Sequence, residues 1–175
     1  FSESNKDIFP IVDRIEWMKT ATDLWWSYWN NDKLIDSLQG SINHSVAKYI
    51  LWKYEIELEP KGQAGYSTIK FDSIFSSELE HIAPTTEPQK KPHGYDDYND
   101  EFIHNYLNCL GNYLWISKSH NCAIGNISFA DKLATYCHNE QQKEIRDLVA
   151  ETSIWSKEVI QLRKDKIISV IMNIY

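Results

Sequence analysis

The sequence has few cysteines and no long apolar run. Its three cysteines, Cys109, Cys122 and Cys137, are too few and too widely spaced for a disulfide framework, and none belongs to a CxxC pair of the kind that holds structural zinc. We expect buried thiols in a reducing cytoplasm. The longest apolar stretches are broken by charges, so the sequence predicts no membrane span.

Basic residues are in deficit, with 18 Lys and Arg against 25 Asp and Glu and a net charge of −7. Affinity for phosphate depends on clustered Lys and Arg, so this balance excludes a general nucleic-acid coat protein. It still allows a nuclease with a locally basic cleft, or one that takes its DNA affinity from another domain. The first residue is Phe rather than Met, and we expect a further segment upstream.

Apolar residues make up 42% of the chain and aromatic residues 13%, which is enough for one packed domain with a helical annex. After Pro10, apolar residues at steps of three and four predict an amphipathic helix as far as Trp29. Asn43 is the predicted cap of a second helix that ends before Pro60. Five tryptophans in this region could form a base-stacking surface, but their spacing favours a core: Trp17, Trp25, Trp26, Trp29 and Trp52.

The middle of the chain predicts two short strands separated by a long loop. Residues 67–75 alternate as a strand, and residues 77–82 continue or re-form it. Residues 84–100 have no periodicity, and a loop of this length is typical of a functional or mobile segment. A short helix or turn is expected over 102–110, and a second strand over 112–116.

Helices are predicted for the rest of the chain. Ser128 and Asp131 form a capping box that opens a helix over 129–137. A further helix is expected over 141–150 and the last from about Ile154 onward. In this last helix the basic residues Arg163, Lys164 and Lys166 alternate with acids, which is typical of a solvated face.

Three short segments carry the candidate chemistry: residues 80–84 (EHIAP), residues 110–114 (LGNYL) and residues 119–121 (SHN). A strand with an acid and a histidine, a second strand, and an asparagine that leads toward a helix form the order that a ββα-metal site needs. Phosphodiester hydrolysis requires a deprotonated water and a cation on the phosphate. Histidine suits the first task, and hard cations prefer oxygen ligands for the second.

These segments resemble the HNH nuclease domain at the C-terminus of GmrSD-type, modification-dependent restriction proteins. That family has an acid-His-hydrophobic-x-Pro segment, a Leu-Gly-Asn segment, a later Asn and a Phe-x-x-Lys helix start, which Phe129 and Lys132 match here. Trp155 and Arg163 fit its closing helix. The resemblance covers about residues 40–175. The family's partner half, an NTP-handling domain, is absent from this sequence, and the resemblance implies such a regulatory partner upstream.

The resemblance implies a role for each matched residue. His81 would be the general base that activates water. Glu80 and Asn121 would hold one divalent cation, Mg²⁺ or Mn²⁺. Asn112 would pin the turn between the strands and orient His81, and Lys132 would approach a phosphate or stabilise developing charge.

Each residue also has a structural interpretation. A single histidine beside Ile and Pro is most often a packed side chain, and Gly-Asn at 111–112 is a common turn. Glu80 and His81 are neighbours on a strand, so they point to opposite faces unless the strand ends or bulges there. His120, beside Asn121, is a weaker candidate for phosphate contact, and His93 is placed in the mobile loop.

We therefore predict a mainly α domain with a small β-hairpin that bears a ββα-metal (HNH) motif. Residues 1–60 are the expected helical lead-in, 61–140 the nuclease core with the loop 84–100, and 141–175 the C-terminal helices that pack on the core. The predicted function is a cytoplasmic, metal-dependent DNA endonuclease, nicking or cutting both strands, in a restriction or phage-defence protein that acts on DNA, including modified phage DNA.

Two other function classes stay open on the sequence alone. One is a degenerate HNH domain that binds DNA or acts as a scaffold without cutting. The other is a helical protein-interaction domain, which would bind no metal and have no strand pair beside His81. An RNA substrate is also open, because phosphate chemistry does not distinguish the sugars.

Overall fold

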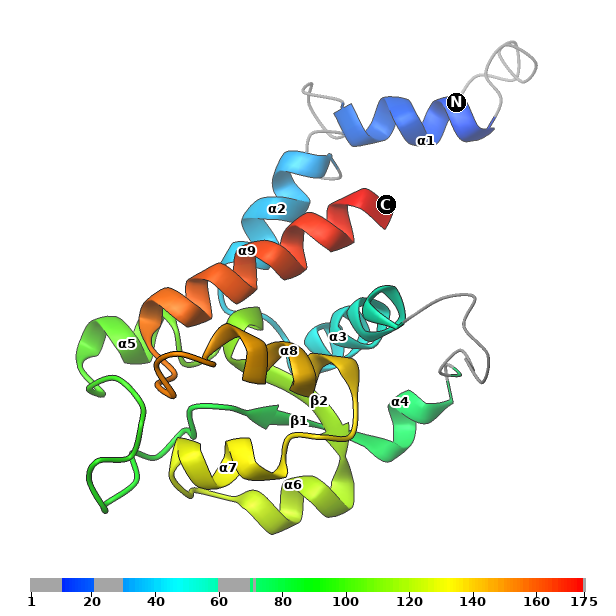
Figure 1. The fold of residues 1–175 in the computed structure, drawn as a ribbon. Coiled ribbons are helices and arrows are strands. Elements are labelled where there is room, and N and C mark those ends of the chain that lie inside the picture. Colours follow the sequence, from blue (N-terminus) through cyan, green and yellow to red (C-terminus); the bar gives the residue numbers. More distant parts are fainter. Residues whose placement is uncertain (1–10, 21–29, 60–69, 71, 175) are drawn as a thin grey trace, which may run out of the picture. The chain divides into compact units, whose positions relative to one another are not determined.

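The computed structural model describes residues 11–20, 30–59, 70 and 72–174 of the chain (Figure 1). The chain divides into two compact units, residues 1–38 and residues 39–175. The described part of the first unit contains α1 (Ile11–Thr20) and most of α2 (Asn31–Gln39). The helix predicted after Pro10 is confirmed as far as Thr20, and its remainder to Trp29 lies outside the described residues.

The second unit is mostly helical with one two-stranded hairpin, which confirms the predicted fold class. Figure 1 shows the hairpin with helices on both of its sides. The elements of this unit, in chain order, are α3 (His44–Leu58), α4 (Ser73–Ser76), β1 (Ser77–His81), α5 (Asp100–Asn105), the 3₁₀ turn η3 (Leu110–Asn112), β2 (Tyr113–Ser117), α6 (Lys118–Ile124), α7 (Phe129–Thr135), α8 (Glu140–Leu148) and α9 (Lys157–Ile174).

Two helix starts follow the predicted caps. The Asn43 side chain accepts a hydrogen bond from the Ser45 amide at the start of α3. The Ser128 hydroxyl accepts one from the Asp131 amide at the start of α7 and donates to the Asp131 carboxylate. A short polar side chain that satisfies a free amide of the first turn explains why both positions could be predicted from sequence.

The predicted strand over residues 67–75 is wrong where the structure describes its end. Residues 73–76 form the single helical turn α4, and serine hydroxyls bond to carbonyls three residues back: Ser73 to Lys70, Ser76 to Ser73 and Ser77 to Ile74. Serines that bond to nearby backbone groups favour a turn over an extended ladder. The continuation over 77–82 is confirmed as β1.

The hairpin pairs β1 with β2 in antiparallel register, with Glu80 opposite Leu114 and His81 opposite Tyr113. Side chains alternate between the two faces of a strand, so each opposed pair shares a face. Glu80 and Leu114 therefore lie on one face of the hairpin, and His81 and Tyr113 lie on the other. The two faces are covered by different parts of the unit.

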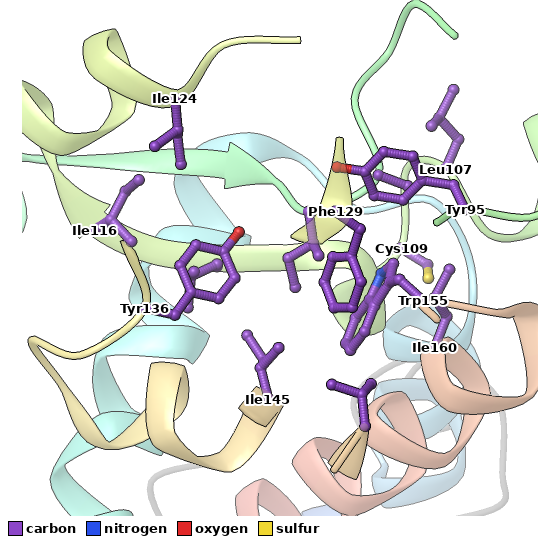
Figure 2. Close-up of a cluster of buried hydrophobic side chains, with 14 of the residues drawn as sticks. Tyr95, Leu107, Cys109, Ile116, Ile124, Phe129, Tyr136, Ile145, Trp155 and Ile160 are labelled. Carbon is purple, nitrogen blue, oxygen red and sulfur yellow. The ribbon is translucent and has the colours of Figure 1, made fainter. Parts of the chain in front are cut away.

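The main core covers the face that carries Leu114 (Figure 2). Phe129 from the start of α7 packs against Trp155, with ring centroids 5.6 Å apart. Figure 2 shows these two rings beside each other, with the remaining members around them. Those members come from the hairpin, the segment between its two strands and helices α6 to α9, among them Tyr95, Leu107, Ile116, Ile124, Tyr136, Ile145 and Ile160.

The predicted loop 84–100 contains no helix or strand before Asp100, where α5 begins, but it is held at several points. The His93 carbonyl accepts a hydrogen bond from the Phe129 amide, and the Gly94 carbonyl accepts one from the Trp155 amide. The His93 side chain is buried, bonded through Nε2 to Glu87 and through Nδ1 to the Tyr95 amide. His93 thus lies in the predicted loop, but its side chain is buried and bonded and not free as a mobile loop would leave it.

Two of the three thiols differ from the prediction. Cys109 is buried in the core, but Cys122 and Cys137 are exposed and free.

Of the predicted tryptophan core, Trp52 is buried and Trp17 is 44% exposed. The other three tryptophans of that group lie outside the described residues. No helix in the described part of the chain is both long and apolar enough to cross a membrane.

Candidate active site

His81 is the last residue of β1, and its imidazole is held by contacts from three segments. Its Nε2 lies 3.0 Å from Oδ1 of Asn108. The ring meets the Tyr113 ring edge to face at a centroid distance of 4.8 Å, and it meets the His44 ring, at the start of α3, at 5.9 Å. We define these four residues, His44, His81, Asn108 and Tyr113, as the His81 cluster.

Burial lowers the pKa of His81, because the charged imidazolium loses solvation. The hydrogen bond to Asn108 opposes this shift, while the nearby His44 and Lys132 add to it. The net shift is downward from the ordinary value near 6.5, so the ring is neutral at pH 7. A neutral imidazole is the form that can accept a proton from water.

Glu80 lies on the opposite face of the hairpin, with 7% of its surface exposed. Its carboxylate is bonded to the ammonium group of Lys132 on α7. The same ammonium donates to the His81 carbonyl at 2.8 Å, and its side chain is fully buried. Burial raises the pKa of the Glu80 carboxyl, and the Lys132 charge opposes this. Lys132 therefore holds the last two residues of β1 in place through bonds made inside the protein.

Asn112 uses its whole hydrogen-bonding capacity inside the protein. Its Nδ2 donates to the carbonyls of Ala83 and Leu107 at 3.0 and 2.9 Å. Its Oδ1 accepts from the Ala83 amide at 2.8 Å and from Nε1 of Trp155 at 3.0 Å. A carboxamide offers two donors and two acceptor lone pairs, and all four are used here. Asn112 thus ties the segment that follows His81 to the turn that precedes β2.

Helix α9 lies directly against this turn. A Cβ atom on Gly111 would come within 2.1 Å of the Ile160 carbonyl oxygen, so only glycine allows this approach. Arg163, which is fully buried, donates to the carbonyls of Leu110, Gly111 and Tyr113 at 3.3, 2.9 and 2.6 Å. The prediction that Arg163 and Lys164 belong to a solvated face is therefore wrong.

Asn121 lies on α6, the helix that directly follows β2 and contacts both strands. This helix was not predicted from the sequence. Asn121 is half-buried, and in the described residues its side chain makes no hydrogen bond to Glu80 or His81. The neighbouring His120 is bonded through Nε2 to Thr135 and through Nδ1 to Gln142.

The predicted cation ligands fit a hard metal by chemistry, because a carboxylate and a carboxamide both offer oxygen. Their arrangement is less direct. The Glu80 carboxylate is bound by Lys132, and among the residues that the structure describes no three His, Cys, Asp or Glu side chains are grouped to hold a metal. A cation at Glu80 would have to share that carboxylate with Lys132.

Neither Asn108 nor His44 was predicted as a site residue. Asn108 lies 27 residues from His81 in the chain, and His44 directly follows the cap Asn43. Nothing in the sequence around Asn108, which precedes the predicted Gly-Asn turn by three residues, indicates a contact with His81 on β1. The predicted pairing of the two strands was the one sequence observation that could have led to Asn108.

Residues 27–170 match the family model described as GmrSD restriction endonucleases, C-terminal domain. The chain belongs to this family. The matched region includes the hairpin, α6 and α7 and therefore every predicted site residue. As a GmrSD C-terminal domain, the chain is related to the nuclease domains of restriction-type proteins, for which DNA is the substrate. Searches of curated proteins and of solved structures gave no match.

Proposed function

We propose that this chain is a metal-dependent DNA endonuclease domain of the HNH type, with His81 as the general base. The observation that carries the proposal is the imidazole at the end of β1, in a hairpin that leads directly into α6 with Asn121. This is the order of elements and residue types that phosphodiester hydrolysis at a ββα site needs. The family membership supports the same reaction class.

The chain's own groups have separate tasks in this proposal. His81, neutral at pH 7, takes a proton from water. Asn112 holds the Ala83 backbone and so fixes the strand end that carries His81. Lys132 acts from the interior, through the His81 carbonyl and Glu80, and not by contact with the phosphate.

Glu80 and Asn121 are the proposed ligands of one Mg²⁺ or Mn²⁺ ion. Such a cation, when bound, would stabilise the negative charge that develops on the phosphate. Because Glu80 and His81 lie on opposite faces of the hairpin, both would serve one phosphate only at the end of β1, where His81 is the last residue. Because Lys132 and a cation would compete for the same carboxylate, we expect weak binding of the metal in the absence of DNA. Isothermal titration with Mn²⁺ should give a weaker signal for Asn121→Ala, and an unchanged affinity in that variant contradicts the ligand role.

Plasmid cleavage tests the proposed activity. Supercoiled DNA incubated with the chain and Mg²⁺ or Mn²⁺ should be nicked or linearised, and His81→Ala should reduce the rate by about 100-fold or more. His104→Ala is the matched control, because His104 is exposed on α5 and bonds only to the Asp100 carbonyl of its own helix. Equal loss in both variants, or full activity in His81→Ala, contradicts the proposal.

The bond between Glu80 and Lys132 favours one other candidate, a domain that binds DNA without cutting it. In that case the buried pair would be purely structural and no cation would bind. The same assay separates the two functions, since a binding module shifts DNA in a gel and leaves the plasmid supercoiled with either metal. A single-stranded RNA substrate in a parallel reaction tests the specificity for DNA.

A further inference from the structure

The two ring nitrogens of His81 have different surroundings. Nε2 is 3.0 Å from Oδ1 of Asn108. Nδ1 has no hydrogen-bond partner in the described part of the chain, and it is not one of the fully buried, unbonded polar atoms found there. Within the described residues Nδ1 is therefore not fully enclosed. Nε2 is bound to the protein, and Nδ1 is the nitrogen that could receive a water molecule.

The orientation of the Asn108 carboxamide determines which nitrogen carries the proton. Its oxygen, and not its NH2 group, faces Nε2. An amide oxygen only accepts hydrogen bonds, so in this orientation Nε2 donates, and the neutral imidazole has its lone pair on Nδ1. We propose that Asn108 is a positioning residue that fixes His81 in this tautomer and leaves Nδ1 as the atom that accepts a proton from the attacking water. The inference rests on the proposed nuclease function.

The step is balanced in atoms and electrons. An O–H bond of water breaks, its proton binds Nδ1, and the oxygen lone pair forms a bond to phosphorus. The bond from phosphorus to the leaving oxygen then breaks, and that oxygen takes a proton from solvent. The imidazolium later returns the proton on Nδ1 to solvent, so nothing is oxidised or reduced. The other proton stays on Nε2 throughout, hydrogen-bonded to the Asn108 oxygen.

The position of Asn108 is fixed by the same residue that fixes the end of β1. Asn112 donates from its side chain to the Leu107 carbonyl at 2.9 Å and from its backbone amide to the Cys109 carbonyl at 3.0 Å. These are the two chain neighbours of Asn108. Asn112 also holds Ala83, so one side chain sets the separation between Asn108 and His81.

Neighbouring rings limit the rotation of the imidazole. Tyr113 lies edge to face against His81 at 75°, and its hydroxyl is 3.5 Å from the same Asn108 oxygen. His44 closes a second side of the ring at an interplanar angle of 65°. A flip of the ring would place a ring carbon where Nε2 now lies and would break the bond to Asn108, so the contacts favour one orientation.

The test uses two substitutions of Asn108 in the full chain. Asn108→Asp keeps an oxygen acceptor at the same place, whereas Asn108→Leu has similar size and no acceptor. Asn105→Leu, at the exposed end of α5, is the matched control. The first readout is the histidine ¹⁵N spectrum at pH 8 without metal, with the His81 signals identified by their loss in His81→Gln.

In the unsubstituted chain and in Asn108→Asp, the His81 proton should be on Nε2 alone. In Asn108→Leu a share of it should move to Nδ1, and in Asn105→Leu nothing should change. A His81 proton on Nδ1 in the unsubstituted chain, or an Asn108→Leu spectrum equal to that of the unsubstituted chain, overturns the inference. Backbone amide spectra of each variant establish that the fold is kept.

The second readout is single-turnover plasmid cleavage. Asn108→Leu should lower the maximal rate by about 10-fold to 100-fold with little change in the half-saturating DNA concentration, and Asn108→Asp should restore most of the rate. If the unsubstituted chain cuts no DNA while its Nε2 proton stays fixed, the nuclease function fails and the role of Asn108 in orienting the ring stands. If it cuts DNA and Asn108→Leu cuts equally well, the positioning role fails alone.

Discussion

The ammonium group of Lys132 lies in the interior of the protein, where it is bonded to the Glu80 carboxylate and to the His81 carbonyl. A charge that is taken out of water requires a partner, and each partner here belongs to the end of β1. Replacing one member would leave the other charged and unpaired in the core. The pair therefore matters more for stability than an ion pair on the surface.

We expect Lys132→Met to lower the free energy of unfolding by about 3–5 kcal/mol, because Glu80 would be left buried without its partner. The double variant Glu80→Gln with Lys132→Met should recover part of this loss. Urea denaturation followed by circular dichroism measures both. Lys143→Met is the control, since Lys143 forms an exposed pair with Glu140 that contributes at most about 1 kcal/mol. Equal losses at the two lysines would contradict the assigned role of the buried pair.

Asn112 is the residue with the most complete set of hydrogen bonds in the candidate site. Asn112→Asp keeps its shape but places an oxygen against the carbonyls of Ala83 and Leu107, where Nδ2 now donates. We expect a loss of about 2–4 kcal/mol in unfolding free energy from two buried acceptors without donors. Plasmid cleavage should fall with it, whereas Asn105→Asp, on an exposed helix end, should change neither quantity. A stable but inactive Asn112→Asp would instead place Asn112 in direct contact with the substrate.

At the scale of elements, close packing at a turn connects α9 to the hairpin. The carbonyl of Ile160 lies where a side chain of residue 111 would begin, and Arg163 satisfies three carbonyls around the same turn. The 3₁₀ turn η3 thus receives from α9 the hydrogen bonds that it cannot form within itself. The strand β2 begins at the next residue, so α9 also sets where the hairpin starts.

Gly111→Ala should therefore destabilise the protein by about 3 kcal/mol, because α9 must move away from the turn to admit a methyl group. Gly40→Ala is a matched control with no atom within 4 Å of the added carbon, and its effect should stay within about 0.5 kcal/mol. Thermal unfolding of both variants provides the measurement. A stable Gly111→Ala would mean that α9 does not lie as close to the turn as described.

Local chemistry explains which elements could be predicted from the sequence. The capping side chains Asn43 and Ser128 act within their own helices, and the predicted strands alternate, so α3, α7 and the hairpin were found. Helix α9 starts at Lys157 and not at Ile154, because the Ser156 hydroxyl accepts a hydrogen bond from the Val159 amide at 3.4 Å and Asp96, in a distant loop, accepts one from the Lys157 amide at 2.6 Å. The Ser156 cap is a local signal that the sequence prediction missed, whereas no pattern near residue 157 contains the contact with Asp96.

The same distinction applies to the candidate site. The order of motifs identified Glu80, His81 and Asn112, and the alternation of a strand anticipated that Glu80 and His81 would face opposite ways. The burial of Lys132 and Arg163 could not be predicted, because the carbonyls that receive them come from other segments. Asn108 was missed for the same reason, since its contact with His81 exists only after the strands pair.

At the scale of the whole molecule, the charge balance opposes DNA binding. The chain carries 25 acidic and 18 basic residues, and phosphate contacts from Lys and Arg supply most of the affinity of proteins for DNA. In the second unit, Lys132, Arg163 and Lys164 are buried and unavailable for such contacts. The domain would thus depend on a neighbouring domain to bring DNA to His81.

Fusion of a basic, sequence-nonspecific DNA-binding domain should accordingly lower the half-saturating DNA concentration for cleavage by about tenfold or more and leave the maximal rate unchanged. Steady-state plasmid cleavage at fixed ionic strength measures both parameters. The control is the same fusion with the basic side chains of the added domain neutralised. An unchanged half-saturating concentration would mean that this chain already binds DNA well by itself.

The clamp of Trp155 and Arg163 on the Leu110–Asn112 turn has a consequence for biosynthesis. A ribosome releases the segment with His81 long before it releases these two residues, and until then Asn112 lacks its indole donor and three turn carbonyls lack the guanidinium. A partly synthesised chain would contain every proposed reactive residue but would lack the contacts of Trp155 and Arg163 that hold the turn in place. We therefore expect no DNA cleavage by the chain before residues 155 and 163 have been added and have packed on the turn.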